Sequence, residues 1–175
     1  MTITIAQFDE LPDAEAAFKL AACCGSGRWV AELLTRRPFG SRGRLVGAAD
    51  EVAASLREPD WLEAFKHHPR IGQRISNAVV STSAESWSTG EQSAVGSAST
   101  AIRAALADAN ADYERRFGFI FIICASGRSA TEILAALRAR MGNTRTAEIF
   151  VAAGEQQQIT RLRLEKLVAP DEAGA

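Results

Sequence analysis

The sequence predicts an all-α protein, a single-domain bundle of about seven to eight helices, from three observations. Apolar residues recur at helical spacing through most of the chain. Candidate caps and proline breaks divide the chain into segments of ordinary helix length. Only residues 117–124 have the composition of a buried strand, and one strand has nothing to pair with. The length of 175 residues fits a single domain over residues 1–175.

Composition and charge exclude several classes of protein. The chain is 47% hydrophobic and 23% charged, which is typical of a globular domain and too apolar for a disordered one. Lys and Arg number 20 against 21 Asp and Glu, so the net charge of −1 argues against a nucleic-acid partner. No apolar run approaches the ~18 residues of a membrane span, and no secretory signal pattern opens the chain. The expected location is therefore the cytoplasm, without a membrane partner.

Two helices are predicted near the N-terminus. Residues 13–22 follow a proline and have one apolar face that includes Phe18. Ser26 can cap a second helix, which carries Trp29 and stops before Pro38.

Two further helices follow. Apolar residues at helical spacing predict a helix over residues 41–57, which Glu58-Pro59 breaks. Asp60 can then cap a short helix from Trp61 to His67, which Pro69 stops.

The middle of the chain changes character. Residues 70–87 are polar, rich in Ser and poorly periodic, which predicts a surface loop of the kind that is usually functional or mobile. From Ser88 a long helix is expected to run to about Arg116, because one face carries apolar residues that include Val95, Ile102, Leu106 and Tyr113.

The run Phe-Gly-Phe-Ile-Phe-Ile-Ile-Cys at residues 117–124 has the local propensity of a strand. The alternatives are a buried extended link, or a helix imposed by tertiary packing. Two helices then complete the chain. Ser129 and Glu132 form a capping box for a helix to Arg140, ended by Gly142 or Asn143. The last helix runs from about Thr144 to Val168, with apolar residues that include Ile149, Phe150, Ile159, Leu162 and Leu167.

His68 is the first candidate for chemistry. A residue before proline is kept out of the α region, so His68 is held at a helix end beside a loop. Imidazole exchanges protons near neutral pH, which suits a catalytic acid or base. The alternative is that His68 only stabilises the helix dipole and contacts water. His67 is the weaker candidate because it lies inside the helix.

Glu91 is the second candidate. Ser88-Thr89-Gly90-Glu91 fits the S-x-x-E capping box, in which the glutamate only accepts from a backbone N–H. The same helix start offers free N–H groups and a positive dipole end, which suit an anion. A carboxylate there, near an imidazole, would make a proton-handling pair.

Arginines and cysteines are less specific. One arginine with a bidentate grip would suit an anionic ligand, but the pattern does not choose among Arg128, Arg138, Arg140, Arg145, Arg161 and Arg163. The three cysteines fit neither a disulfide framework nor a metal-ligand spacing, so no metal site is expected. Cys23-Cys24 is interpreted as a helix end and Cys124 as a buried small hydrophobe. A thiol-based enzyme or redox sensor using one of these three remains an alternative.

Six pieces in order resemble one known family. They are Cys23-Cys24-Gly25-Ser26 with Trp29, Trp61-Leu62-Glu63-Ala64-Phe65, His68-Pro69-Arg70-Ile71-Gly72, Ser88-x-x-Glu91-Gln92, Phe117 to Ala125, and Ile159-Thr160-x-Leu162-Arg163-Leu164. Together they look like 2-oxo-4-hydroxy-4-carboxy-5-ureidoimidazoline (OHCU) decarboxylase, the last enzyme from urate to allantoin. The resemblance covers about residues 8–168, the expected core of one domain. Ile120 stands where the family often has proline, and the stretch between His68 and Glu91 is longer and richer in Ser than usual.

The resemblance implies a function and a site. It implies an all-α, homodimeric enzyme without cofactor or metal, which decarboxylates OHCU, an anionic small molecule, to (S)-allantoin. It implies His68 and Glu91 as catalytic residues. The substrate-binding residues it implies are Pro69, Ser88, Thr89, Gly90, Gln92, Ile122, Ile123, Cys124, Ala125, Ser126 and Arg163. The rival hypothesis is a non-catalytic helical module that binds a ureide.

Overall fold

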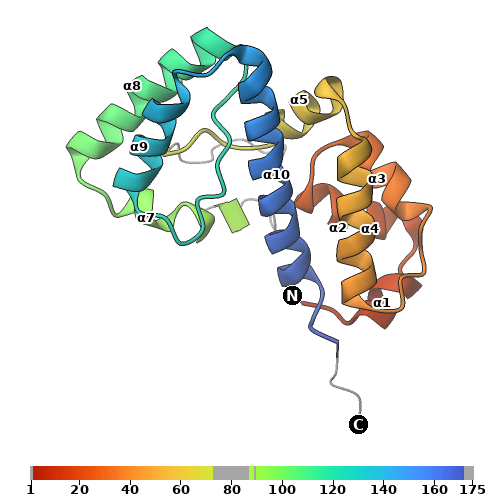
Figure 1. The fold of residues 1–175 in the computed structure, drawn as a ribbon. Helices are drawn as coiled ribbons and strands as arrows, with labels where there is room; N and C mark the ends of the chain where they lie inside the picture. The colour runs from red at the N-terminus through yellow and green to blue at the C-terminus, as the bar shows by residue number, and fades with distance from the viewer. Residues whose placement is uncertain (1, 73–86, 89, 172–175) are drawn as a thin grey trace. The chain divides into compact units, whose positions relative to one another are not determined.

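The structure is a computed structural model that describes residues 2–72, 87–88 and 90–171 (Figure 1). Within that part of the chain it has nine bounded helices and no strand, only an isolated backbone bridge between Ile3 and Val168. The all-α prediction is confirmed, with slightly more helices than expected. No helix among the described residues is long and apolar enough to cross a bilayer.

The chain divides into two compact units. Unit 1 consists of residues 1–64 and 157–175, and unit 2 of residues 65–156. The prediction of a single domain is not tested by this division and stays a prediction. The last helix, α10 (Arg145–Leu167), contributes its first half to unit 2 and its second half to unit 1.

Unit 1 begins with α1 (Ile5–Glu10), α2 (Asp13–Cys23), α3 (Gly27–Leu34) and α4 (Arg42–Ser55). The last three confirm the predicted helices within one or two residues, and α1 was not predicted. Ser26 caps α3 as expected, since its hydroxyl accepts from the Trp29 backbone N–H at 3.3 Å. The buried Trp29 indole donates to the Ala49 carbonyl at 3.2 Å and so joins α3 to α4.

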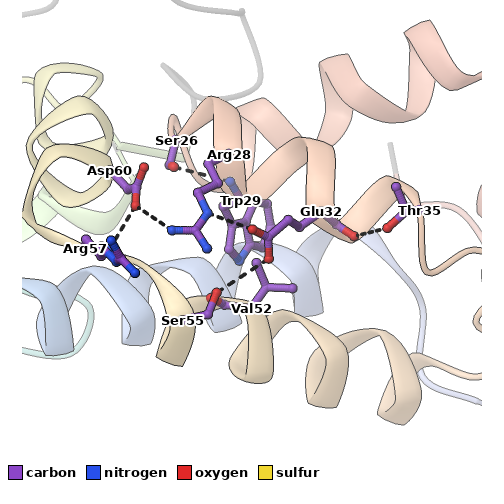
Figure 2. A network of polar contacts seen from close by, with 9 residues as sticks. All are labelled: Ser26, Arg28, Trp29, Glu32, Thr35, Val52, Ser55, Arg57 and Asp60. Atoms are coloured by element: carbon purple, nitrogen blue, oxygen red, sulfur yellow. Dashed lines mark hydrogen bonds and ion pairs between the residues drawn. The ribbon is translucent and has the colours of Figure 1, made fainter.

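A surface network ties α3 and α4 to α5 (Glu58–Lys66), as Figure 2 shows. Arg28 Nε donates to Glu32 at 2.7 Å, and its Nη1 donates to Asp60 at 3.3 Å. Asp60 also accepts from the Arg57 backbone N–H at 2.9 Å. The prediction that Asp60 precedes the helix is therefore wrong. Pro59 lies in the first turn of α5, where its missing N–H costs nothing, and Asp60 caps from inside the helix.

Two phenylalanines expected in the core are exposed instead. Phe18 is 62% exposed and Phe150 is 61% exposed. The buried face of α2 carries Ala16, Leu20 and Cys23. Phe18 lies two positions from the first two of these, about 200° around the helix, and so faces the other way. Phe150 stands in the same relation to the buried Ala152 on α10.

In unit 2 the predicted long helix is divided. The structure has a short α7 (Ser93–Gly96) and then α8 (Thr100–Phe117). Ser97 bonds back to the Ser93 and Ala94 carbonyls, and Ser99 accepts from the Ile102 N–H at 3.3 Å. Serine side chains that bond to the backbone in this way end one helix and cap the next. The predicted loop falls largely on residues 73–86, which lie outside the described residues.

The run after α8 is a buried link without helix or strand, the second of the three alternatives (Figure 1). Gly118, at φ 79°, ends α8 in the left-handed region that favours glycine. The link leads to α9 (Ala130–Arg140), which begins with the predicted capping box of Ser129 and Glu132. Its C-cap is Met141, one residue before the predicted end. The predicted last helix is confirmed within one residue at each end by α10.

Aromatic rings build the core of unit 2. Tyr113 on α8 has its ring centroid 4.6 Å from that of Phe117, 5.9 Å from Phe119 and 5.1 Å from Phe121. Phe65, at the end of α5, packs 5.6 Å from Phe119. These contacts bury the link between α8 and α9 and bring it beside the chain that leads to His68.

Candidate active site

His68 lies just past the end of α5. Its backbone N–H donates to the Phe65 carbonyl at 3.1 Å, which completes the last turn before Pro69. His68 and Pro69 are half-buried, whereas His67 is exposed. The predicted position of His68 at a helix end is confirmed.

The residues that follow His68 are fixed against α8. Arg70 donates from Nε and Nη2 to the two carboxylate oxygens of Glu114, at 2.9 and 2.7 Å. The buried Asn110 donates from Nδ2 to the Ile71 carbonyl at 3.3 Å. A bidentate ion pair and a buried amide together hold this backbone in one place.

A hydrogen bond joins the His68 segment to the Glu91 segment. The Gly72 N–H donates to Oε1 of Gln92 at 3.0 Å. Gly72 has φ +85°, and a Cβ there would lie 3.4 Å from Cγ1 of the buried Val95. The two candidate catalytic segments therefore meet at a position that requires glycine. Oε1 of Gln92 is thus engaged, and the Nε2 group is the part of this side chain that can donate to a ligand.

The Ser88 segment departs from a simple cap. Ser88 and Glu91 are both in helical conformation, and the buried Ser88 accepts at its carbonyl from the Gln92 N–H at 3.1 Å. Ser88 thus lies inside a helical turn and not directly before it, so the expected start of the helix at Ser88 is wrong. Glu91 is half-buried and Gly90 exposed, while Thr89 lies outside the described residues.

The predicted binding segment Ile122–Ser126 is buried except for Ser126. The Ile122 carbonyl accepts from Arg140 Nη1 at 2.8 Å. The Cys124 N–H donates to Oε2 of Glu155 at 2.7 Å. Of the backbone groups expected to hold substrate oxygens, the Cys124 N–H is therefore already engaged. Neither Arg140 nor Glu155 was predicted to contact this segment, because no local pattern marks a partner so distant in sequence.

Electrostatics link Glu91 to the same segment. Burial is the largest effect on the Cys124 thiol and raises its pKa, and a hydrogen bond to the Ser126 backbone opposes it as the next largest effect. The carboxylates of Glu155 and Glu91 then raise the pKa of this thiol, and Arg128 lowers it. Burial also raises the pKa of Cys24, to about 11. Such thiols stay protonated at neutral pH and are weak nucleophiles, which disfavours Cys24 and Cys124 as the nucleophile of a thiol enzyme.

Arg163 belongs to unit 1. It is 3% exposed, and its Nη1 donates to the Ala22 carbonyl near the end of α2 at 3.1 Å. By contrast, Arg161 is exposed and pairs with Asp50 at 3.1 Å. The role of Arg163 in substrate binding stays a prediction.

Unit 2 contains a cavity beside α8. A cavity of about 200 Å³ is lined by residues that include Arg70, Gly72, Arg103, Asn110 and Glu114, but not by His68 or Glu91. Among the described residues, no group of three His, Cys, Asp or Glu side chains could hold a metal ion.

Known proteins resemble this chain in sequence. The family model described as OHCU decarboxylase matches residues 9–165. The uric acid degradation bifunctional protein TTL of Arabidopsis thaliana is 39% identical over 145 residues, which are 83% of this chain and 45% of that protein. The chain thus spans less than half of the Arabidopsis protein. The 2-oxo-4-hydroxy-4-carboxy-5-ureidoimidazoline decarboxylase of Amia calva is 32% identical over 136 residues, 75% of each chain.

Solved structures of similar proteins agree with the sequence comparisons. A crystal structure of OHCU decarboxylase in the presence of (S)-allantoin superposes with a TM-score of 0.73 at 35% identity, covering 85% of this chain and 96% of that one. A crystal structure of (S)-allantoin synthase has a TM-score of 0.70 at 20% identity, over 95% of this chain and 54% of that one, and shows likeness of fold. Because the family model matches nearly the whole chain, and the motifs that it shares meet in the structure, this chain belongs to the OHCU decarboxylase family.

Proposed function

We propose that this protein decarboxylates OHCU to (S)-allantoin in urate degradation, with His68 and Glu91 as its catalytic residues. The observation that carries the proposal is the Gly72–Gln92 hydrogen bond, which joins the His-Pro segment to the S-x-x-E-Q segment. Membership in the OHCU decarboxylase family supplies the substrate.

The reaction needs no electron sink beyond the substrate. The bond from ring carbon 4 to the carboxylate breaks, carbon dioxide leaves, and the electron pair moves into the conjugated imine of the ring. The hydroxyl on carbon 4 then becomes a carbonyl, and carbon 5, which carries the ureido group, gains a proton. One proton is consumed for each carboxylate. The protein has to hold the carboxylate out of conjugation, stabilise the developing charge and protonate one face.

Each candidate residue has a part in this scheme. His68 bonds the hydroxyl or supplies the proton, and Glu91 orients His68 or the ureido N–H groups. Gln92 donates from Nε2, and backbone N–H groups within residues 122–126, other than that of Cys124, donate to ring oxygens. Arg163 holds the substrate carboxylate.

Oligomeric state and location belong to the same proposal. We expect a homodimer in the cytoplasm, on the strength of membership in the OHCU decarboxylase family. Sedimentation equilibrium tests the dimer directly, because a monomer would give the chain mass of 18.8 kDa and a dimer twice that mass.

The rival function is ureide binding without turnover. Calorimetric titration with (S)-allantoin, combined with release of labelled carbon dioxide from freshly made OHCU, separates the two. We expect carbon dioxide release that rises in proportion to protein concentration. Binding of allantoin with release at the spontaneous rate would favour the binding module.

A further inference from the structure

Two charged clusters, each built around a glutamate of α10, hold the link between α8 and α9. One is built around Glu148, which is 0% exposed and lies on α10. Glu148 accepts from the Tyr113 hydroxyl, from Arg140 Nε at 2.7 Å and from Asn143 Nδ2 at 2.6 Å. Arg140, thus fixed, has its guanidinium carbon 4.5 Å from the Phe121 ring centroid and donates to the Ile122 carbonyl.

The second cluster is built around Glu155, seven residues further along α10. Its side chain is 14% exposed, accepts from the Cys124 N–H at 2.7 Å and pairs with Arg128 Nη2 at 3.6 Å. The Arg128 backbone N–H donates to the Ala125 carbonyl at 3.0 Å, across a turn with Gly127 at φ 78°. Glu155 therefore holds the segment at Cys124, and its partner Arg128 closes the turn that ends it.

Burial of the link alone does not explain why a charged group accepts from the Cys124 N–H. A buried N–H is satisfied by any neutral acceptor. Here a carboxylate takes that place, and hydrogen bonds to charged groups are shorter and stronger than neutral ones. The Cys124 thiol lies within electrostatic range of both Glu155 and Glu91.

We infer that Glu155 is a positioning residue for the reaction: by fixing the Cys124 amide, it sets the placement of the segment Ile122–Ser126 against the substrate. The inference rests on the proposed function, because that function makes this segment a wall of the site. It adds a role for Glu155, which acts through the segment and does not touch the substrate.

Two variants of Glu155 separate positioning from charge. Glu155→Ala removes the acceptor, whereas Glu155→Gln keeps an oxygen that can accept from the Cys124 N–H. The matched control is Glu165→Ala, which truncates an exposed glutamate on the same helix. Each variant is measured for thermal melting, for kcat and KM with OHCU, and for hydrogen exchange of the Cys124 amide by NMR.

We expect Glu155→Ala to stay folded, to speed exchange of the Cys124 amide about fivefold or more, and to lower kcat/KM about tenfold or more. We expect Glu155→Gln to keep exchange of the Cys124 amide and kcat/KM close to their wild-type values. Glu165→Ala should match the wild type in both measurements. Unchanged exchange in Glu155→Ala would overturn the inference. So would faster exchange with unchanged kcat/KM, or a loss of activity no larger than the loss of folded protein.

The proposed function fails on a different observation. A wild type that does not accelerate decarboxylation would refute the function, and with it a role for Glu155 in that reaction. The exchange result would then still decide whether Glu155 holds the segment.

Discussion

At the scale of single residues, His68 has the most demanding role. We expect His68→Asn to lower kcat by about two orders of magnitude, the low end of what a positioned proton donor contributes, with melting unchanged. The measurement is the steady-state rate together with thermal melting. His67→Asn is the matched control, because His67 is exposed and one residue away. Equal rates for both variants and the wild type would remove His68 from the mechanism.

For Glu91, a capping role and a catalytic role lead to different expected results. Glu91→Gln keeps the shape and the acceptor oxygen of a capping residue, so unfolding free energy should change by less than ~1 kcal/mol. The variant loses the charge that stabilises a protonated His68, so turnover should fall by at least ~10²-fold. Melting and rate are measured on one preparation. Normal activity would reduce Glu91 to a structural residue.

A substitution of Arg163 tests the prediction that this residue binds the substrate. Arg163→Lys keeps a cation that can donate to the Ala22 carbonyl but loses the planar fork that matches a carboxylate. We expect KM to rise roughly tenfold, the value of one charge-assisted hydrogen bond, with kcat less affected. Arg161→Lys on the same helix is the comparison. The reverse result, with KM raised only by Arg161→Lys, would assign the role to Arg161.

At the scale of elements, the junction at Gly72 links the two candidate catalytic segments. Gly72→Ala places a Cβ at a φ of +85° and 3.4 Å from Val95. We expect a loss of about 1–2 kcal/mol of unfolding free energy and a melting temperature lower by several degrees. Activity should fall as well, because the segments that carry His68 and Glu91 meet here.

Gly154→Ala is a control that we expect to raise the melting temperature, whereas Gly72→Ala should lower it. Gly154 lies in α10, and a Cβ there meets nothing within 4 Å. Alanine is the better helix former by about 1 kcal/mol, so this variant should melt higher and keep its activity. A Gly72→Ala protein that melts with the wild type would show that the junction tolerates a side chain.

Local signals account for the elements that the sequence predicted. Ser26 and the pair of Ser129 and Glu132 each act within a few residues, and α3 and α9 begin where these caps place them. The predicted break at Glu58-Pro59 is wrong, because Pro59 lies in the first turn of α5. The division between α7 and α8 was missed although its cause is also local. The apolar face of residues 94–113 continues across Ser97 and Ser99, and the periodicity outweighed the two serines.

Short motifs marked the candidate catalytic residues, whose roles stay a prediction, whereas no motif marked the distant residues that contact the candidate binding segment. His68 and Glu91 follow from short motifs. Arg140 and Glu155 contact residues 18 and 31 positions away, and only tertiary packing brings them there. Sequence periodicity also could not tell that Phe18 and Phe150 face away from the buried sides of their helices.

At the scale of the whole molecule, the family model and the structure divide the chain differently. The family match runs from residue 9 to 165 without interruption, whereas the structure has two compact units that share α10. His68, Glu91 and the segment Ile122–Ser126 belong to unit 2, and Arg163 belongs to unit 1. An account of the reaction therefore has to be tested on the intact chain.

The most direct test adds the intact protein to a freshly made urate-oxidation mixture, in which OHCU is present before it decays, and follows circular dichroism. We expect optically active (S)-allantoin to appear faster than in the protein-free mixture, at a rate proportional to protein concentration, and the His68→Asn variant to lose this signal. Formation of racemic allantoin at the rate of the protein-free mixture would contradict the central claim that this protein is a stereospecific decarboxylase.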